Sequence, residues 1–160
     1  MIISNKKEYI MGFDVHGMNN DAYFRNNVCY WRPLWGYVCY FSGDILSEED
    51  KTLGQSNSRH HIDEEKTKKL IIRLEDLLKD GQTQRNSRYH SRKARNAPDE
   101  ICEHCNGTGK QGDENDKHAC NRCEGKGTIR PDWTEYPFKT KNVRDFIKFL
   151  KKTEGGFIIC

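Results

Sequence analysis

The chain is poor in apolar residues. They make up 34 % of its 160 residues, while charged residues make up 32 %. Typical globular domains have a larger share of apolar residues and a smaller share of charged ones. The core of this chain must therefore be small, and we expect an additional element to stabilise the fold. The length fits one domain, or one small domain that carries an insertion.

Long apolar runs are absent as well. No run could cross a membrane, and residues 1–7 lack the apolar centre of an export signal, so we expect a cytoplasmic protein with no membrane partner. The sequence has no G-x-G-x-x-G, no Walker phosphate loop and no nucleophile elbow, so no motif of this kind supports an enzyme. A net charge of +3 is too small to indicate nucleic-acid binding by itself.

Four of the seven cysteines lie in two copies of the pattern C-x-x-C-x-G-x-G. Cys102 and Cys105 belong to the first copy, and Cys120 and Cys123 to the second. Each C-x-x-C turn points two thiolates at one centre, and two such turns complete the four-sulfur cage that Zn²⁺ prefers. The glycines allow the backbone to fold around the metal. We therefore predict one structural zinc, with no open coordination position for catalysis.

Other assignments of the cysteines are conceivable from spacing alone. A disulfide pair or a redox dithiol shares the C-x-x-C spacing. His104 lies inside the first copy and His118 just before the second, so either is an alternative ligand in place of a cysteine. The remaining Cys29, Cys39 and Cys160 are odd in number, which favours free thiols in a reducing compartment.

The doubled pattern resembles the cysteine-rich zinc region of DnaJ chaperones, in which four such repeats bind two zinc ions. This chain has two repeats, within residues 102–127, so the resemblance implies a DnaJ-type zinc-binding hairpin with one ion. The His-Pro-Asp signature of the J-domain is absent, and the expectation of chaperone activity is not carried over.

The segments outside the hairpin also show a resemblance as a set. Residues 12–17, 23–26, 31–35 and 155–157 are similar to those of a group of small uncharacterised proteins common in phage genomes. The resemblance implies a phage or mobile-element origin, and therefore the host cytoplasm, but no established activity. A modulator or inhibitor of a host system then becomes a reasonable expectation.

Periodicity and capping residues predict four helices. They run from Pro33 to about residue 41, from Ser47, from the cap Asp63 to Gly81, and over about 141–152. We expect short strands at residues 9–13 and 157–160 that pair with each other, and a loop over 14–21.

These elements indicate a small α+β domain that is mainly helical, with a projecting zinc hairpin and short terminal strands. We divide the chain into a core domain at 1–98, the zinc module at 99–130, and a C-terminal helix and strand at 131–160 that pack back on the core.

Residues 82–98 form a basic segment without a single acid. If the segment is helical, its arginines share one face and suit an anionic partner. Its candidate partner-binding residues are Arg85, Arg88, Arg92, Lys93 and Arg95. A solvated helix or a linker is the alternative interpretation.

The aromatic segment has two interpretations. We expect Trp35 in the core, whereas Trp31 is a candidate for either the core or a pocket. The alternative is a small-ligand pocket in which aromatic rings stack a base and arginines hold phosphate, with Asp14, His16, Arg25, Trp31 and Arg32 as its candidates. The motif D-x-H-G at residues 14–17 resembles the first motif of calcineurin-like metallophosphoesterases, and Gly43-Asp44 is a candidate for the second. The third motif has no full match and the late G-H-x-H motif is missing, so we predict no such enzyme.

Together these features predict a non-catalytic, zinc-stabilised binding protein with a macromolecular partner, most simply a protein. A nucleic-acid-binding regulator that uses the zinc module and the basic segment is the first alternative. A nucleotide-binding protein or enzyme that uses the aromatic segment is the second.

Overall fold

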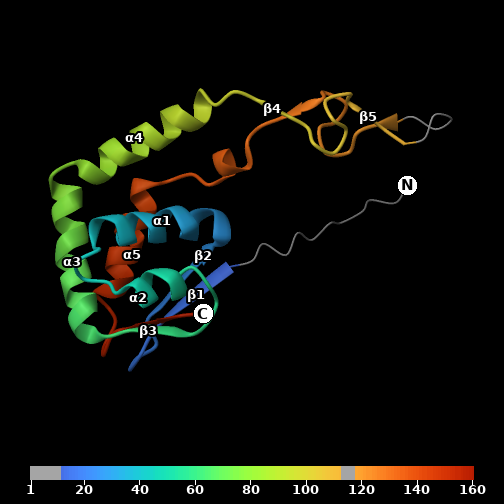
Figure 1. Cartoon of the computed structure of the whole chain (residues 1–160). Coiled ribbons are helices and arrows are strands. Elements are labelled where there is room, and N and C mark those ends of the chain that lie inside the picture. The colour runs from blue at the N-terminus through green and yellow to red at the C-terminus, as the bar shows by residue number, and fades with distance from the viewer. Residues whose placement is uncertain (1–11, 113–117) are drawn as a thin grey trace. The chain divides into compact units, whose positions relative to one another are not determined.

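The computed structural model describes residues 12–112 and 118–160 and confirms the expected α+β fold (Figure 1). The chain divides into two compact units. One consists of Met1–Tyr89 with Pro137–Cys160, and the other of His90–Tyr136. Among the helices of the described ranges, none combines the length and apolar character needed to cross a bilayer.

The first unit contains a four-stranded antiparallel sheet with the strand order β2-β1-β8-β3. Its strands are β1 (Gly12–Gly17), β2 (Tyr23–Asn27), β3 (His60–Ile62) and β8 (Phe157–Ile159). Val15 lies opposite Ile159 in the register of β1 and β8. The predicted pairing of the two terminal segments is therefore confirmed, although residues 9–11 of the expected first strand lie outside the described residues.

Alternation along the strands explains which face of the sheet joins the core. Side chains alternate between the two faces of a strand, so one apolar residue in every two suffices to build the inner face. The residues that form this inner face are all nearly or fully buried: Phe13, Val15, Ile62, Phe157 and Ile159.

Two sequence expectations about this sheet need correction. Residues 14–17 were expected in a loop, but β1 continues to Gly17 because it has a pairing partner on each side, β2 and β8. The strand β3 was not anticipated at all. It is three residues long and is specified by its pairing with β8, which comes almost a hundred residues later in the chain.

Helix α1 (Val28–Phe41) begins earlier than expected. Its N-cap is Asn27, whose side chain accepts a hydrogen bond from the Tyr30 backbone N–H at 3.0 Å. Pro33, expected in the first turn, instead lies inside the helix. A proline there removes one backbone hydrogen bond, and burial of this aromatic helix compensates for that loss.

The centre of the core is an aromatic stack on α1. Trp31 and Trp35 are both fully buried, with ring centroids 5.5 Å apart and planes inclined by 10°. Phe13 also stacks on Trp31, with ring centroids 5.3 Å apart. The indole N–H of Trp31 donates to the Gly54 carbonyl at 2.9 Å, so its polar group is satisfied. Trp35 is in the core, as expected.

The remaining helices of the first unit are α2 (Glu48–Leu53), α3 (Glu64–Lys79), α4 (Gln82–Arg95, shared with the second unit) and α5 (Thr140–Leu150). The expected caps Ser47 and Asp63 are both present, and Gly81 follows α3 with a positive φ of 73°. On α5, the apolar face contributes Phe146, which contacts Trp31 edge-on.

A buried carboxylate joins three elements of this unit. Asp50 of α2 is 3 % exposed and lies 2.8 Å from the His60 ring and 2.7 Å from the Lys66 ammonium. It also accepts the backbone N–H of Ser47 at 2.8 Å. Burial alone would raise the pKa of Asp50, but the hydrogen bonds from Lys66, His60 and Ser47 outweigh it and hold that pKa well below its ordinary value.

An Asp50→Asn variant is therefore expected to be less stable than the wild type by about 1.5–3 kcal/mol at pH 7, the range for a hydrogen bond to a charged group. A carboxyl with a depressed pKa stabilises the fold above its unfolded pKa, near 4, and this contribution is lost as the pH falls through the folded pKa. Urea unfolding should show the difference shrinking as the pH falls below about 4. Glu49→Gln, on the exposed side of α2, is the control, and an equal loss there would contradict the role of Asp50.

Candidate metal centre

The second unit is built as two similar halves. The strand before the first cysteine pair, β4 (Glu100–Ile101), pairs with β7 (Thr128–Ile129), which follows the second pair. Likewise β5 (Lys110–Gln111) pairs with β6 (His118–Ala119), which precedes the second pair. Each cysteine turn is therefore held at both ends by the other half of the hairpin.

Backbone hydrogen bonds repeat this symmetry. The Cys102 N–H donates to the Gly127 carbonyl, and the Cys120 N–H to the Gly109 carbonyl, both at 2.9 Å. Gly109 and Gly127 have positive φ, and a Cβ on either would lie only 2.3–2.4 Å from a carbonyl oxygen of the opposite half. The glycines of the sequence pattern are thus required by close backbone approach as well as by conformation.

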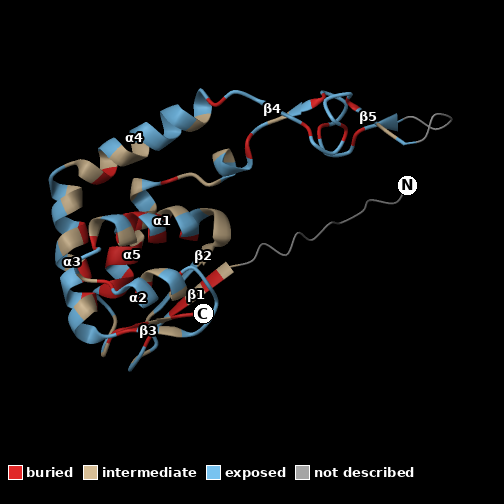
Figure 2. Cartoon of the chain, in the orientation of Figure 1, coloured by how far each residue is buried: buried red, intermediate tan, exposed pale blue. Residues whose placement is uncertain are grey.

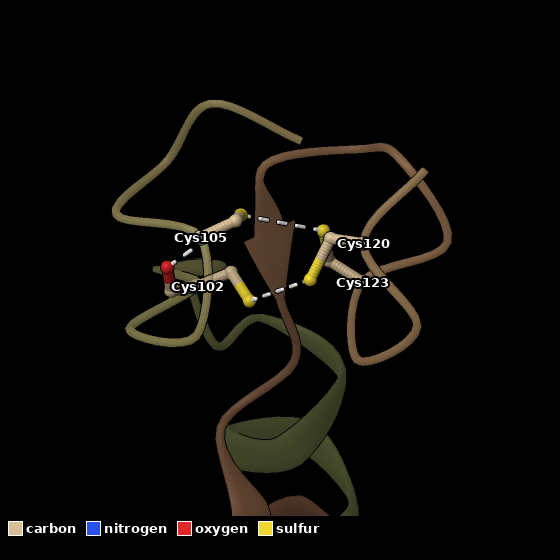
Figure 3. A group of neighbouring side chains, drawn as sticks. All are labelled: Cys102, Cys105, Cys120 and Cys123. Carbon is tan, nitrogen blue, oxygen red and sulfur yellow. Dashed lines mark hydrogen bonds between the residues drawn. The ribbon is translucent and has the colours of Figure 1, made fainter. Parts of the chain in front are cut away.

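The four cysteine sulfurs gather at one point between the halves (Figure 3). The Cys102 and Cys120 sulfurs are 3.9 Å apart, those of Cys105 and Cys123 are 3.7 Å apart, and all four lie within 4.8 Å of one another. A tetrahedral zinc with Zn–S bonds of about 2.3 Å requires sulfurs about 3.8 Å apart. The sulfurs are too far apart for disulfides, and their spacing fits a metal ion.

Backbone donors support ionised sulfur at this centre. The Gly109 N–H points at the Cys105 sulfur and the Gly127 N–H at the Cys123 sulfur, each at 3.2 Å. Burial opposes ionisation of Cys123, but the Gly127 N–H and neighbouring donors bring its pKa down to about 7. At Cys102, burial dominates and raises the pKa to about 11. Four buried thiols in this arrangement can hold a metal ion, and the donors favour a thiolate-bound one.

The histidines near the pattern lie outside the sulfur group. His104 and His118 are both exposed, and the group of potential ligands in the described residues consists of the four cysteines. The other cysteines lie in the first unit as free thiols, half-buried. Among them, Cys39 has its pKa raised to about 12 by burial, which makes it unreactive.

The predicted basic segment forms the helix α4, most of which is exposed or only partly buried (Figure 2). Its five candidate residues are all exposed. Arg85 donates to the Asp80 carbonyl and to Gln82, whereas Lys93 lies 5.3 Å from the centre of the Trp133 ring. Of the five cations on α4, none forms an ion pair with a described carboxylate. The helix thus presents a cationic surface that the described part of the chain does not neutralise.

Each end of α4 makes contacts within its own unit. Near its start, the Thr83 hydroxyl lies 2.9 Å from the buried Tyr37 hydroxyl. After its last turn, Arg130 of the hairpin donates to the Ala97 carbonyl at 2.8 Å and also to the Ala94 carbonyl. Arg130 therefore caps the C-terminal end of α4 from within the metal-binding unit.

The candidate small-ligand residues are divided between the two faces of the sheet. Trp31 lies in the core, so it does not line an open pocket. Asp14, His16 and Arg25 lie on the outward face, where the Arg25 Nε is 3.8 Å from Asp14. Arg32 is exposed on α1.

Sequence reasoning did not select Tyr23, which joins the outward cluster. Its hydroxyl donates to Asp14, and this hydrogen bond raises the pKa of Tyr23. Its ring lies 5.0 Å from that of His16. The signal was present in the sequence, since Tyr23 and Arg25 are two residues apart on a strand and must share a face.

Comparison of the chain with protein-family models, with curated proteins and with solved structures gives no match. Any functional conclusion therefore depends on the geometry of the sites themselves.

Proposed function

We propose that this protein is a non-catalytic binding protein, in which Cys102, Cys105, Cys120 and Cys123 hold one structural zinc ion in a DnaJ-like hairpin and the cationic face of α4 docks on an acidic protein surface. The observation that carries the first part is the buried group of four sulfurs, in which two pairs are 3.7 and 3.9 Å apart and all four lie within 4.8 Å of one another. Four thiolates leave no position for a water or substrate, which favours a structural ion over a catalytic one.

The zinc would supply folding energy that the second unit lacks on its own. Among the described residues of this unit, the buried apolar cluster consists of the four cysteines, with Ile129 packed against it. Such a small cluster cannot offset the conformational entropy of ordering a hairpin of this length. A metal ion that binds only the folded hairpin would make up the difference.

The recognition surface is the arginine face of α4. Arg85, Arg88, Arg92 and Arg95 follow one another at intervals of three, four and three residues and so lie on one side of the helix. From the first to the last they extend over about 15 Å, at 1.5 Å per residue. Guanidinium groups bind carboxylates in a bidentate manner. The four arginines of this face form no ion pair with a described carboxylate of the chain, so their guanidinium groups are available to a partner.

Charge distribution favours an acidic protein over nucleic acid at this face. Residues 90–136, which include the end of α4, contain nine Asp and Glu against eight Lys and Arg. Four thiolates with Zn²⁺ would add a further formal charge of −2. A long phosphate backbone requires cations over an extended path, whereas a local acidic patch needs only the arginine face. The resemblance to phage proteins favours a host protein as the source of that patch.

The proposal predicts that reversing Arg88, Arg92 and Arg95 to glutamate abolishes binding to an acidic probe without unfolding the protein. Arg85 is left intact because it bonds to the end of α3. Exposed charges contribute little to stability, so the melting temperature should change by only a few degrees. Binding to fluorescent polyglutamate, measured by anisotropy at low and physiological salt, is the test.

The matched control reverses Lys79, Arg144 and Lys152, which are exposed cations outside α4, and changes the net charge equally. This variant should bind the probe at least tenfold more tightly than the α4 variant. Equal loss in both variants would show a net-charge effect and overturn the proposed face. If the wild type binds a DNA duplex more tightly than it binds polyglutamate of the same charge, the nucleic-acid alternative replaces the acidic protein partner.

A further inference from the structure

The outward face of the four-stranded sheet carries a continuous row of side chains. Tyr23 of β2 lies opposite His16 of β1, His16 lies opposite Ile158 of β8, and Ile158 lies opposite His61 of β3. Neighbouring strands are about 4.8 Å apart, so the row extends over about 14 Å across the sheet. It places three aromatic rings and one apolar side chain in a single line.

The described helices leave most side chains of this face exposed. The inward side chains of the same strands, such as Val15 and Ile62, are completely buried, whereas Tyr23 is 52 % exposed and both histidines are exposed. The rings of Tyr23 and His16 contact each other, with centroids 5.0 Å apart. Aromatic side chains that lie side by side on an open sheet form a surface on which planar groups can stack.

One cation and one carboxylate, Arg25 and Asp14, lie beside the row. Arg25 follows Tyr23 on the same face, and its guanidinium extends along β1, where a Cβ on Gly12 would lie 3.3 Å from its Nε. The one carboxylate among the outward residues of β1 and β2, Asp14, accepts the Tyr23 hydroxyl and lies 3.8 Å from Arg25. Asp14 is therefore engaged in positioning Tyr23 and Arg25.

Together, this geometry points to a binding site for single-stranded nucleic acid on the outward face of the sheet. Bases would stack on Tyr23, His16 and His61, and Arg25 would contact a phosphate. Only an unpaired strand exposes the faces of its bases to protein side chains, whereas a duplex buries them in its own stack. The row accommodates two or three bases, which matches its three aromatic rings. The site is separate from the arginine face of α4.

The test uses the full chain with Arg88, Arg92 and Arg95 already reversed, so that α4 does not contribute. Anisotropy of a fluorescent oligo-dT or oligo-U of eight nucleotides should report binding, with a duplex at least tenfold weaker. Tyr23→Ala should weaken binding about tenfold or more, because base stacking is lost. Tyr23→Phe keeps the ring and should stay within about threefold. His61→Ala, at the other end of the row, should also weaken binding.

Tyr40→Ala is the matched control, since Tyr40 is a highly exposed aromatic on α1 and lies outside the sheet. It should leave affinity unchanged, and thermal melting should confirm that every variant is folded. The inference is overturned if the oligonucleotide does not bind, if a duplex binds equally well, or if Tyr23→Ala and His61→Ala both bind as the parent does. None of these results bears on the polyglutamate test of α4, so the two proposals fail independently.

Discussion

A Cys102→Ser variant is expected to lose its metal and the order of its hairpin together. Elemental analysis of the wild type should return about one zinc per chain, and of the variant almost none, because three thiolates no longer complete the cage. Structural zinc contributes an apparent 10–16 kcal/mol at neutral pH, roughly as much as or more than the whole stability of a small domain. The backbone amides of residues 100–111 and 118–129 should then lose their protection from hydrogen exchange.

The first unit should survive this change, because its aromatic core is made by residues outside the hairpin. Far-UV circular dichroism should therefore retain most of its helical signal. Cys160→Ser, which removes a half-buried free thiol at the end of the chain, is the control and should keep the metal. Acidification should mimic Cys102→Ser, since protons compete with the metal for thiolates. A protected hairpin in metal-free protein would contradict the metal's structural role.

The cysteine site was predictable because its determinants are local. Each pair of ligands lies within four residues, and the glycines that follow are fixed by the turn itself, so the pattern specifies both ligands and backbone. Helix caps such as Asp63 were predictable for the same reason: the cap accepts the N–H of Lys66, three residues away. The stripe of arginines on α4 likewise follows from helical periodicity alone.

Features that depend on distant parts of the chain were missed. The strand β3 forms because it pairs with β8, where His61 lies beside Ile158. The residues next to His61 in the sequence show no pattern that predicts a strand. The extension of β1 through His16 has the same cause, since it pairs on both sides. The start of α1 was placed too late because Pro33 is typical of a first turn, and tertiary burial outweighs that local preference.

A Trp31→Ala variant is expected to destabilise the first unit by about 3–5 kcal/mol, the range for truncating a large core aromatic. The change removes a fully buried ring that stacks with both Phe13 and Trp35, and it leaves the Gly54 carbonyl without its donor. Total stability of a small domain is about 5–15 kcal/mol, so much of the protein should be unfolded at 37 °C. Urea unfolding followed by circular dichroism measures the loss directly.

Two further substitutions separate packing from hydrogen bonding at this position. Trp31→Phe keeps an aromatic ring but removes the indole N–H, so it should cost clearly less than alanine. Trp133→Ala removes the third tryptophan, which is 43 % exposed in the second unit, and it should leave the unfolding of the first unit unchanged. If Trp31→Ala were as stable as Trp133→Ala, the indole stack would not be the centre of the core. The aromatic segment would then be free to bind a ligand, because an open site tolerates truncation that a packed core does not.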